Sequence, residues 1–294
     1  MQSRKRDRME KAQKIAVITD SCSDVPVELA AELGIYVVAL HINYHDASYR
    51  DRVDIQPDEV YARFSEEIPR TSTPSPSDVA EAFDTMVAEG VTHVIGVTIS
   101  SGLSGTYNLF KSVATGYRDL TVEIVDTKRI GLGSGLTAVE AARLAKQGVP
   151  FEEIIERAYR SAQSTYAYFC VDTLEYLYKG GRISKAVYSI GSALDVRPII
   201  ACNDEGVYVP VAKAHGRKAS LKKALSIVKK KAAGAKRYRF AVVHGGAYEE
   251  ARELFEQGCE AMSDAEEFVF EQISPALVVH TGPGLIGIGV QILD

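Results

Sequence analysis

Hydroxyl side chains gather in the segment 97–108, which reads VTISSGLSGTYN. Ser100, Ser101 and Ser104 lie there between a β-branched run and a helix-like pattern. A serine at such a position can act as a nucleophile, and hydroxyls beside the free N–H groups of a helix start can bind an anion. The same residues can also simply cap a helix. The segment therefore predicts catalysis, anion binding or a structural turn.

Little else that serine catalysis requires is present in the sequence. The nucleophile-elbow pattern G-x-S-x-G is absent from the chain. No base and no orienting acid lie close to these serines in sequence, and His280 is the base that we would assign. A serine-dependent esterase or acyltransferase using Ser101 or Ser104 is therefore kept as the alternative function.

A second hydroxyl-rich segment, RTSTPSPSD at residues 70–78, precedes another predicted helix. Pro74 and Pro76 restrict its backbone. For one such segment capping is the simpler interpretation, but with two of them a carboxylate or phosphate site becomes an equal alternative. The candidate hydroxyls of this second segment are Thr71, Ser72 and Thr73.

The elements that must position these segments alternate between strand and helix over residues 15–163. We expect strands at 15–19, 35–44, 91–100 and 121–127, and a loop at 70–78. Helices are expected at 26–34, 58–67, 78–90 with Ser77 as N-cap, 104–117, 135–148 and 150–165. This spacing is typical of βαβ units and predicts a parallel sheet with helices on both faces. Ligands of such sheets bind at the carboxyl ends of the strands.

From about residue 164 the pattern changes to strands and turns with two further helices. Strands are expected at 166–171, 197–215 as a hairpin around the NDEG turn, 238–246, 266–274 and 276–293. Helices are expected at 219–234 and 248–262. The sequence thus predicts an α/β protein of two domains, with a parallel α/β/α domain at 15–163 and a mixed α+β domain at 164–294. The charged segment 1–14 is expected to be a disordered tail.

Composition excludes several classes of protein. The 34 Lys and Arg and 39 Asp and Glu give a net charge of −5, which favours neither nucleic acid nor an anionic membrane as partner. No apolar run is long enough to span a membrane, and the N-terminus does not resemble a secretory signal. Four separated cysteines then favour free thiols in the cytoplasm.

No metal and no cofactor are expected. His41 and His45 have a metal-like spacing, but they follow an apolar run that we expect to be extended, so they do not share a face. The glycines of 131–135, GLGSG, resemble a dinucleotide loop only superficially, because the third glycine falls one place early. We interpret them as small residues that let a helix pack closely on the sheet.

A basic segment stands out against the acidic chain. Eleven Lys or Arg lie between Lys213 and Arg239, and no Asp or Glu occurs from Gly206 to Tyr248. A solvated helix face explains this equally well as a docking surface for an acidic partner. Nucleic acid is disfavoured because no aromatic residues are interleaved with the charges before Tyr238.

Several stretches, in order from about residue 15 to 290, together resemble the DegV family of bacterial fatty-acid-binding proteins. They are IAVITDSCSDVP, TSTPSPSD, VTISSGLSGTYN, VDTKRIGLGSG, VDTLEYLYKGGRIS, RPIIACNDEGVYVPVAKAHGRKASL and VHTGPGLIGIG. The resemblance implies two domains with a long-chain fatty acid bound between them. It also implies a protein that is not itself a catalyst, and that presents the acyl carboxylate to a fatty-acid kinase for acyl-phosphate formation and phospholipid synthesis.

The resemblance also assigns residues. It places the fatty-acid carboxylate on Thr71, Ser101 and His280, with Ser72, Thr73 and Ser100 as possible further head-group contacts. Thr73 stands where the family often has glutamine, so the choice between Thr71 and Thr73 stays open. Arg182 falls where the family presents a basic residue to its kinase, and Arg217 of the basic segment is a second candidate for that surface. Contact with a membrane is expected to be transient at most.

Overall fold

The computed structural model describes residues 13–191 and 196–293. Most of the tail predicted at 1–14 therefore lies outside the described residues. The two residues of it that are described, Gln13 and Lys14, are hydrogen-bonded to the fold. The Gln13 side chain accepts from Phe151 N at 2.9 Å, and Lys14 N donates to Thr92 Oγ1 at 3.0 Å.

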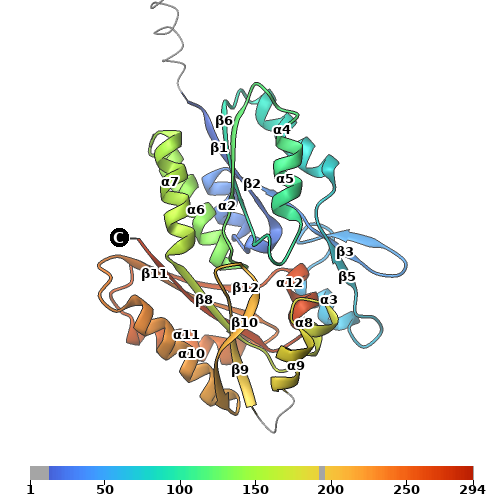
Figure 1. Ribbon diagram of the computed structural model, residues 1–294, viewed down its shortest axis with the longest axis vertical. Helices are drawn as coiled ribbons and strands as arrows, with labels where there is room; N and C mark the ends of the chain where they lie inside the picture. Colours follow the sequence, from blue (N-terminus) through green and yellow to red (C-terminus); the bar gives the residue numbers. More distant parts are fainter. Residues whose placement is uncertain (1–12, 192–195, 294) are drawn as a thin grey trace, which may run out of the picture.

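The first half of the chain builds a parallel sheet in the order β2-β1-β6-β7 (Figure 1). Its strands are β1 (Ile15–Asp20), β2 (Ile35–Val38), β6 (His93–Thr98) and β7 (Thr121–Asp126). The helices α2 (Val27–Leu33), α6 (Leu132–Lys146) and α7 (Phe151–Gln163) cover one face, and α4 (Pro76–Ala88) and α5 (Thr106–Ala114) cover the other. The predicted parallel sheet with two covered faces is confirmed.

From β1 the chain adds β2 on one side of the sheet and then β6 and β7 on the other side. The order in which strands are added therefore changes direction between β1 and β6. At such a point the loops after the two strands diverge and leave room for a ligand at the carboxyl ends. The short 3₁₀ helix η1 (Ser21–Ser23) follows β1, and the serine-rich segment follows β6. The fold thus places the serine-rich segment 97–108 at this position.

A mixed sheet follows from residue 165, in the order β10-β9-β8-β13-β11-β12. Its strands are β8 (Thr165–Cys170), β9 (Val196–Cys202), β10 (Tyr208–His215), β11 (Tyr238–Gly245), β12 (Glu267–Gln272) and β13 (Leu285–Ile292). Only β11 and β12 pair in parallel among the named pairs. The helices α10 (Arg217–Ala232) and α11 (Tyr248–Ala261) pack on its outer face. The mixed second half and its NDEG hairpin are confirmed, while the exact domain boundary stays a prediction.

A small antiparallel sheet, which the sequence analysis missed, corrects two predictions. It has the order β4-β3-β5, with β3 (His41–Asn43), β4 (Ser48–Arg50) and β5 (Arg70–Ser72). The single strand predicted at 35–44 is wrong, because β2 and β3 belong to different sheets. The loop predicted at 70–78 is wrong at its start, because Thr71 belongs to β5 and pairs with Ile42 of β3. Such pairing between distant segments leaves no local signal in a three-residue strand.

Several helix and strand boundaries also differ from expectation; α6, for example, begins at Leu132 and not at residue 135, and two further differences bear on the site. Ser75, not Ser77, is the N-cap of α4, because its hydroxyl accepts from Asp78 N and Pro76 occupies the first helical position. The predicted strand 276–293 is wrong over its first part, which forms α12 (Pro275–Thr281). Its β-branched residues favour a strand locally, but α12 packs against η1, β3, β5, α3 (Pro57–Arg63) and α8 (Glu175–Lys179). A further helix, α9 (Lys185–Gly191), follows α8.

Candidate functional site

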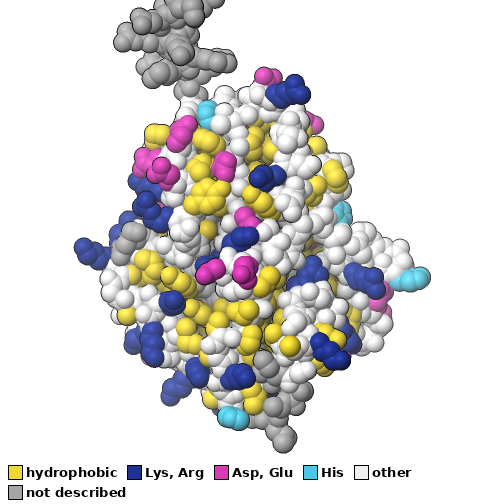
Figure 2. All heavy atoms as spheres, in the orientation of Figure 1, with side chains coloured by type: hydrophobic (Ala, Val, Ile, Leu, Met, Phe, Trp, Pro, Cys, Tyr) yellow, Lys and Arg dark blue, Asp and Glu magenta, His cyan; other side chains and the backbone are white. Residues whose placement is uncertain are grey.

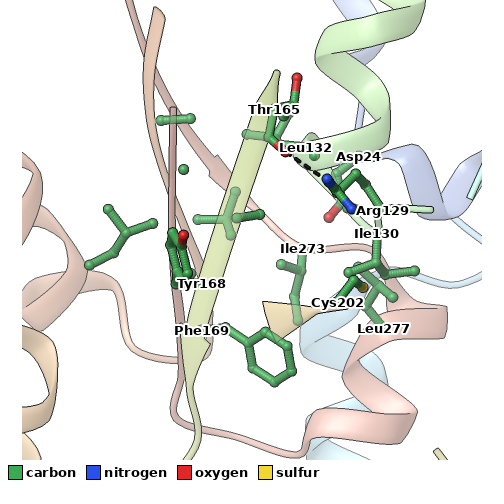
Figure 3. Close-up of a pocket in the computed structure, with 18 of the residues that line it drawn as sticks. Asp24, Arg129, Ile130, Leu132, Thr165, Tyr168, Phe169, Cys202, Ile273 and Leu277 are labelled. Carbon is green, nitrogen blue, oxygen red and sulfur yellow. Dashed lines mark hydrogen bonds between the residues drawn. The ribbon is translucent and has the colours of Figure 1, made fainter. Parts of the chain in front are cut away.

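Two cavities meet in the space between the parallel and the mixed sheets. The first, which we call the hydroxyl cavity, has a volume of about 480 Å³ and is lined by Thr71, Ser101 and His280 together with neighbouring hydroxyls. The second, the apolar cavity, has a volume of about 70 Å³. Its wall comes from β8, β13, the start of α6 and α12, with Phe169, Leu132 and Leu277 around the space (Figure 3).

The two cavities are adjacent. Ile130, Tyr208 and Leu277 line both of them. The hydroxyl cavity is rich in hydrogen-bonding groups, whereas the wall of the apolar cavity is mostly carbon, with Asp24, Arg129, two threonines and three tyrosines among its residues. Side by side, the two cavities offer a polar end and an apolar end, which suits an amphipathic ligand.

Thr71 and His280 are hydrogen-bonded at the polar end, with 2.7 Å between Thr71 Oγ1 and His280 Nε2. Thr71 comes from β5 and His280 from the last turn of α12. The other ring nitrogen, Nδ1, has no hydrogen-bond partner within the described part of the chain. A methyl group at Gly180 would overlap this nitrogen, so the glycine lets the backbone after α8 approach the ring closely.

His280 is neutral in this setting. Burial, together with the smaller effect of the nearby Arg182 guanidinium, lowers the pKa of His280 to about 3. A neutral imidazole offers one donor and one acceptor. When Nε2 carries the proton it donates to Thr71, and the Thr71 hydroxyl is then free to donate to a ligand in the cavity.

Ser101 lies on the same cavity, and it is anchored from behind. Its backbone N donates to Asp126 Oδ1 at 3.1 Å, and its hydroxyl accepts from Lys128 Nζ at 2.8 Å. Ser72, Thr73 and Ser104 also line the cavity. The structure therefore brings both predicted hydroxyl segments and His280 to one place.

Two of the predicted residues have other contacts. Ser100 is fully buried and is not part of the cavity wall; its hydroxyl donates to Gly206 O at 2.7 Å and accepts from Gly102 N at 3.0 Å. Arg217 is held away from the cavity by ion pairs with Asp172 and Glu250, each at 2.6 Å. Neither Ser100 nor Arg217 is among the residues that line the hydroxyl cavity.

Arg182, by contrast, lines the cavity next to His280. Its Nη1 donates to Gly180 O at 2.6 Å. It also lines an adjoining surface cavity of about 590 Å³, together with Ile183, Val187 and Tyr208. Arg182 thus lies between the polar end of the ligand space and the outside.

The exposed lysines of the basic segment gather elsewhere. Lysines of α10 dominate the lower left of Figure 2, over the outer face of the mixed sheet. The helix is amphipathic in the ordinary sense, since Leu221, Ala224 and Val228 are buried against the sheet. A solvated helix face accounts for this part of the basic segment.

Comparisons with known proteins identify the family. The DegV family model, described as "Uncharacterised protein, DegV family", matches residues 14–292. A DegV domain-containing protein of Clostridium acetobutylicum is 42% identical over 278 residues, which is 94% of this chain and 98% of that protein. The chain belongs to the DegV family.

Solved structures of other DegV proteins have the same fold. A fatty-acid-binding DegV family protein from Thermus thermophilus superimposes with a TM-score of 0.89 and 31% identity, covering 96% of this chain and 100% of that one. A stearic-acid-binding protein from Eubacterium ventriosum gives a TM-score of 0.86 and 27% identity, covering 96% of this chain and 98% of that one. The two-domain α/β prediction is confirmed by this agreement.

Three buried carboxyl groups of this DegV chain were not singled out from the sequence. Asp20 accepts from Ile99 N at 2.9 Å and from Cys22 N at 3.1 Å. Asp51 accepts from the Ser21 hydroxyl at 2.6 Å. Asp24 accepts from Ser274 N, at the start of α12, at 2.8 Å. They tie η1 to the serine-rich segment, to the loop after β4 and to α12.

Burial dominates the titration of these carboxyl groups. It raises the pKa of Asp20 and of Asp51 to about 7, and that of Asp24 to about 6 despite the nearby Arg52. Asp20 and Asp24 are the first and last residues of the DSCSD sequence at the end of β1, and this pair of carboxyl groups was the signal available in the sequence. Within residues 13–191 and 196–293 no group of three or more His, Cys, Asp or Glu is placed to hold a metal ion.

The arrangement of DegV residues does not favour serine catalysis. His280 is hydrogen-bonded to Thr71 instead of a serine, and its Nδ1 lacks the orienting acid of a catalytic triad among the described residues. Ser101 accepts from a lysine, and Ser104 hydrogen-bonds to Thr106 at 2.9 Å.

No described helix is both long and apolar enough to cross a membrane.

Proposed function

We propose that this chain binds a long-chain fatty acid, with the carboxylate in the hydroxyl cavity and the acyl tail in the apolar cavity between the two domains. The observation that carries the proposal is that the two cavities lie next to each other and share Ile130, Tyr208 and Leu277 in their walls. The fatty-acid and stearic-acid binding described for two proteins of the same fold supports it.

The polar end offers what a carboxylate needs. A carboxylate removed from water is costly unless its oxygens accept hydrogen bonds. Thr71 and Ser101 supply hydroxyl donors from opposite segments, and neutral His280 orients Thr71. Thr73 and Ser72 lie nearby on the same wall and are further head-group candidates. Arg182 adds positive charge beside the site.

The apolar end requires only carbon surface. Each buried methylene contributes about 0.8 kcal/mol, so a long tail binds without specific contacts. The wall side chains Leu132, Leu136 and Leu285 are almost fully buried. The polar end thus sets the orientation of the ligand and the apolar end supplies the affinity, as expected of a carrier protein.

We propose further that the protein is the non-catalytic partner of a cytoplasmic fatty-acid kinase. Arg182 joins the hydroxyl cavity to the adjoining surface cavity, so a second protein bound there would reach the carboxylate. In the proposed step a carboxylate oxygen attacks the γ-phosphorus of ATP in the kinase, and ADP leaves. The carrier contributes binding and orientation, and its own serines form no covalent bond.

Native mass spectrometry of the purified protein tests the binding proposal. We expect a fatty acid of mass near that of stearate to co-purify or to bind when added. The double variant Thr71→Ala/Ser101→Ala should bind stearate at least tenfold more weakly than the wild type. Thr115→Ala is the matched control, since Thr115 is an exposed hydroxyl residue bonded only to Ser112 O. Absence of any bound or added fatty acid would refute the proposal.

A purified fatty-acid kinase with ATP tests the second part. We expect hydroxylamine to trap an acyl phosphate only when kinase and loaded carrier are both present. An Arg182→Ala variant should bind stearate but support slower product formation. A fluorophosphonate probe should leave Ser101 and Ser104 unlabelled. Labelling of either serine, with release of an acyl group in the absence of kinase, would favour the esterase instead.

A further inference from the structure

Lys128 lies directly behind Ser101, outside the set of residues assigned to the ligand so far. It is in the loop between β7 and α6, and its backbone has a φ of 56°, which non-glycine residues seldom adopt. Its Nζ is 2.8 Å from Ser101 Oγ and 2.7 Å from Asp126 Oδ2. The left-handed backbone turns the loop so that this side chain reaches both partners.

The three residues form a closed hydrogen-bonded ring. Asp126 Oδ1 accepts from Ser101 N at 3.1 Å and from Lys128 N at 3.2 Å. Burial acts to raise the pKa of Asp126, but the hydrogen bonds from Lys128 and Ser101 outweigh it and lower the pKa below its usual value. Asp126 is therefore an ionised carboxylate with three donors already bound to it.

This ring constrains the proton of Ser101. An ammonium group has donors and no acceptor, so the bond between Lys128 and Ser101 uses a lone pair of the hydroxyl oxygen. The hydroxyl proton then has two acceptors within reach, the Asp126 carboxylate, whose pKa a side-chain hydrogen bond from Ser101 also lowers, and a ligand oxygen in the hydroxyl cavity. Because the Lys128 ammonium balances the charge of Asp126, an anionic ligand oxygen is the stronger acceptor for that proton. A charged donor also polarises the hydroxyl and strengthens that second bond.

Lys128 also cancels a charge. Without it, Asp126 would place an uncompensated negative charge close behind the site that receives the ligand carboxylate. Like charges at this range repel, and more strongly in a partly buried setting than in water. The ion pair at 2.7 Å balances the charge of Asp126 behind Ser101.

The second half of the chain holds the lysine in place. A methyl group at Gly206, in the turn between β9 and β10, would come within 3.0 Å of Lys128 Cδ, so the turn packs on the lysine stem. Gly206 O also accepts from the Ser100 hydroxyl. The serine-rich segment, the lysine and the turn thus form one unit across the two sheets.

We propose that Lys128 is a positioning residue that directs the Ser101 hydroxyl toward the ligand and makes the site select an anionic head group. This inference rests on the proposed function and adds the determinant of head-group charge. It predicts that removing the ammonium group harms carboxylate binding specifically, without harming the acyl-tail contacts.

The test compares stearate with stearyl alcohol, which has the same tail and a neutral head. Calorimetry compares the wild type with Lys128→Met and Lys128→Arg. In Lys128→Met we expect stearate affinity to be at least tenfold weaker than in the wild type, and stearyl alcohol affinity to stay within twofold of it. In Lys128→Arg we expect stearate binding to recover. Lys128→Met combined with Ser101→Ala should lose less stearate affinity than the sum of the two single losses, because only the charge balance of Asp126 is left for Lys128 to supply when the hydroxyl is absent. Equal loss for both ligands, or additive losses in the double variant, would overturn the inference.

A second measurement does not depend on affinity. Stearate labelled with ¹³C at the carboxyl carbon reports the ionisation of the bound head group by NMR. We expect the pKa of the bound carboxyl to be about one unit higher in Lys128→Gln than in the wild type, because a tenfold preference for the anion corresponds to one unit. An unchanged pKa would overturn the inference while leaving fatty-acid binding intact, whereas no stearate signal in the wild type would refute the proposed function itself.

Discussion

Thr71 and His280 are 209 residues apart in the sequence and hydrogen-bonded at 2.7 Å in the structure. One comes from a three-residue edge strand and the other from the end of a seven-residue helix. Their contact closes the polar end of the ligand space against β5 and α12. The first prediction concerns this pair.

Thr71→Val keeps the shape of the side chain and removes the hydroxyl. It leaves the His280 ring without its partner in a site that is largely shielded from water. We expect the free energy of unfolding to fall by about 1–3 kcal/mol, the usual cost of an unsatisfied buried polar group. Chemical denaturation measures this, and stearate binding should weaken in parallel. Thr115→Val is the control, and an equal loss there would contradict the assignment.

Gly180→Ala tests the close approach behind His280. A methyl group there would overlap Nδ1, and Gly180 has an ordinary helical φ of −74°, so the effect is steric and does not arise from the backbone. We expect the ring to be displaced and stearate affinity to drop at least tenfold. Gly116→Ala is the matched control, because a methyl group at Gly116 meets only Val113 O at 3.4 Å. Full binding by Gly180→Ala would show that the ring position is not needed.

The buried carboxyl groups predict how stability depends on pH. The folded-state pKa of Asp20 and Asp51 is about 7, above the unfolded value of 3.8, so between these values the folded state holds protons that the unfolded state has lost. Their contribution to stability therefore rises as pH falls through 7. His280 acts oppositely, since its folded pKa of about 3 lies below its unfolded value of 6.5. Its contribution falls as pH drops from 6.5 to 3.

Between pH 8 and pH 6 the carboxyl groups dominate, because His280 begins to matter only at the lower end of this window. We expect the free energy of unfolding to increase on going from pH 8 to pH 6, by up to about 1.4 kcal/mol per pH unit for each proton taken up. Denaturation at pH 8, 7 and 6 measures this. Asp51→Asn should flatten the dependence, while the exposed Asp54→Asn should leave it unchanged. A dependence of the opposite sign would contradict the buried assignment.

Narrowing the apolar cavity should change chain-length preference. Ala241 is buried on β11 and lines this cavity. Ala241→Leu adds carbon to the wall, so we expect affinity to fall more for an 18-carbon acid than for a 14-carbon acid. Calorimetry with both acids measures the ratio. Ala219→Leu, on the exposed face of α10, should leave the ratio unchanged. An equal loss for both acids in Ala241→Leu would place the tail elsewhere.

Much of the site was predictable because its chemistry lies in local patterns. The apolar strand β6 followed by Ser100, Ser101 and Ser104 places hydroxyls at the carboxyl end of a parallel strand, wherever the rest of the chain goes. Gly34 and Gly148 follow α2 and α6 and have positive φ, a conformation that favours glycine. These glycines therefore mark the ends of the two helices locally. Thr71 and His280 were each candidates from the residues alone, but only the resemblance to the DegV family placed them together at one carboxylate.

Other features depend on contacts that no local pattern encodes. The segment that contains His280 has the β-branched composition of a strand, yet it forms α12 because Ser274 and Pro275 begin a helix that packs against elements from both halves of the chain. Asp126 and Lys128 have no obvious function in the sequence, since the chemistry arises only when the β7 loop meets Ser101 and the Gly206 turn.

The sequence by itself determined most of the periodic elements and the hydroxyl segments, because each of these rests on side chains only a few residues apart. The tertiary structure decided which hydroxyls share a cavity with His280, which serine instead holds the Gly206 turn, and where the polar and apolar cavities lie next to each other. Those outcomes depend on packing between residues as distant as Thr71 and His280, and such packing reflects the free energy of the whole fold and not the preference of any one segment.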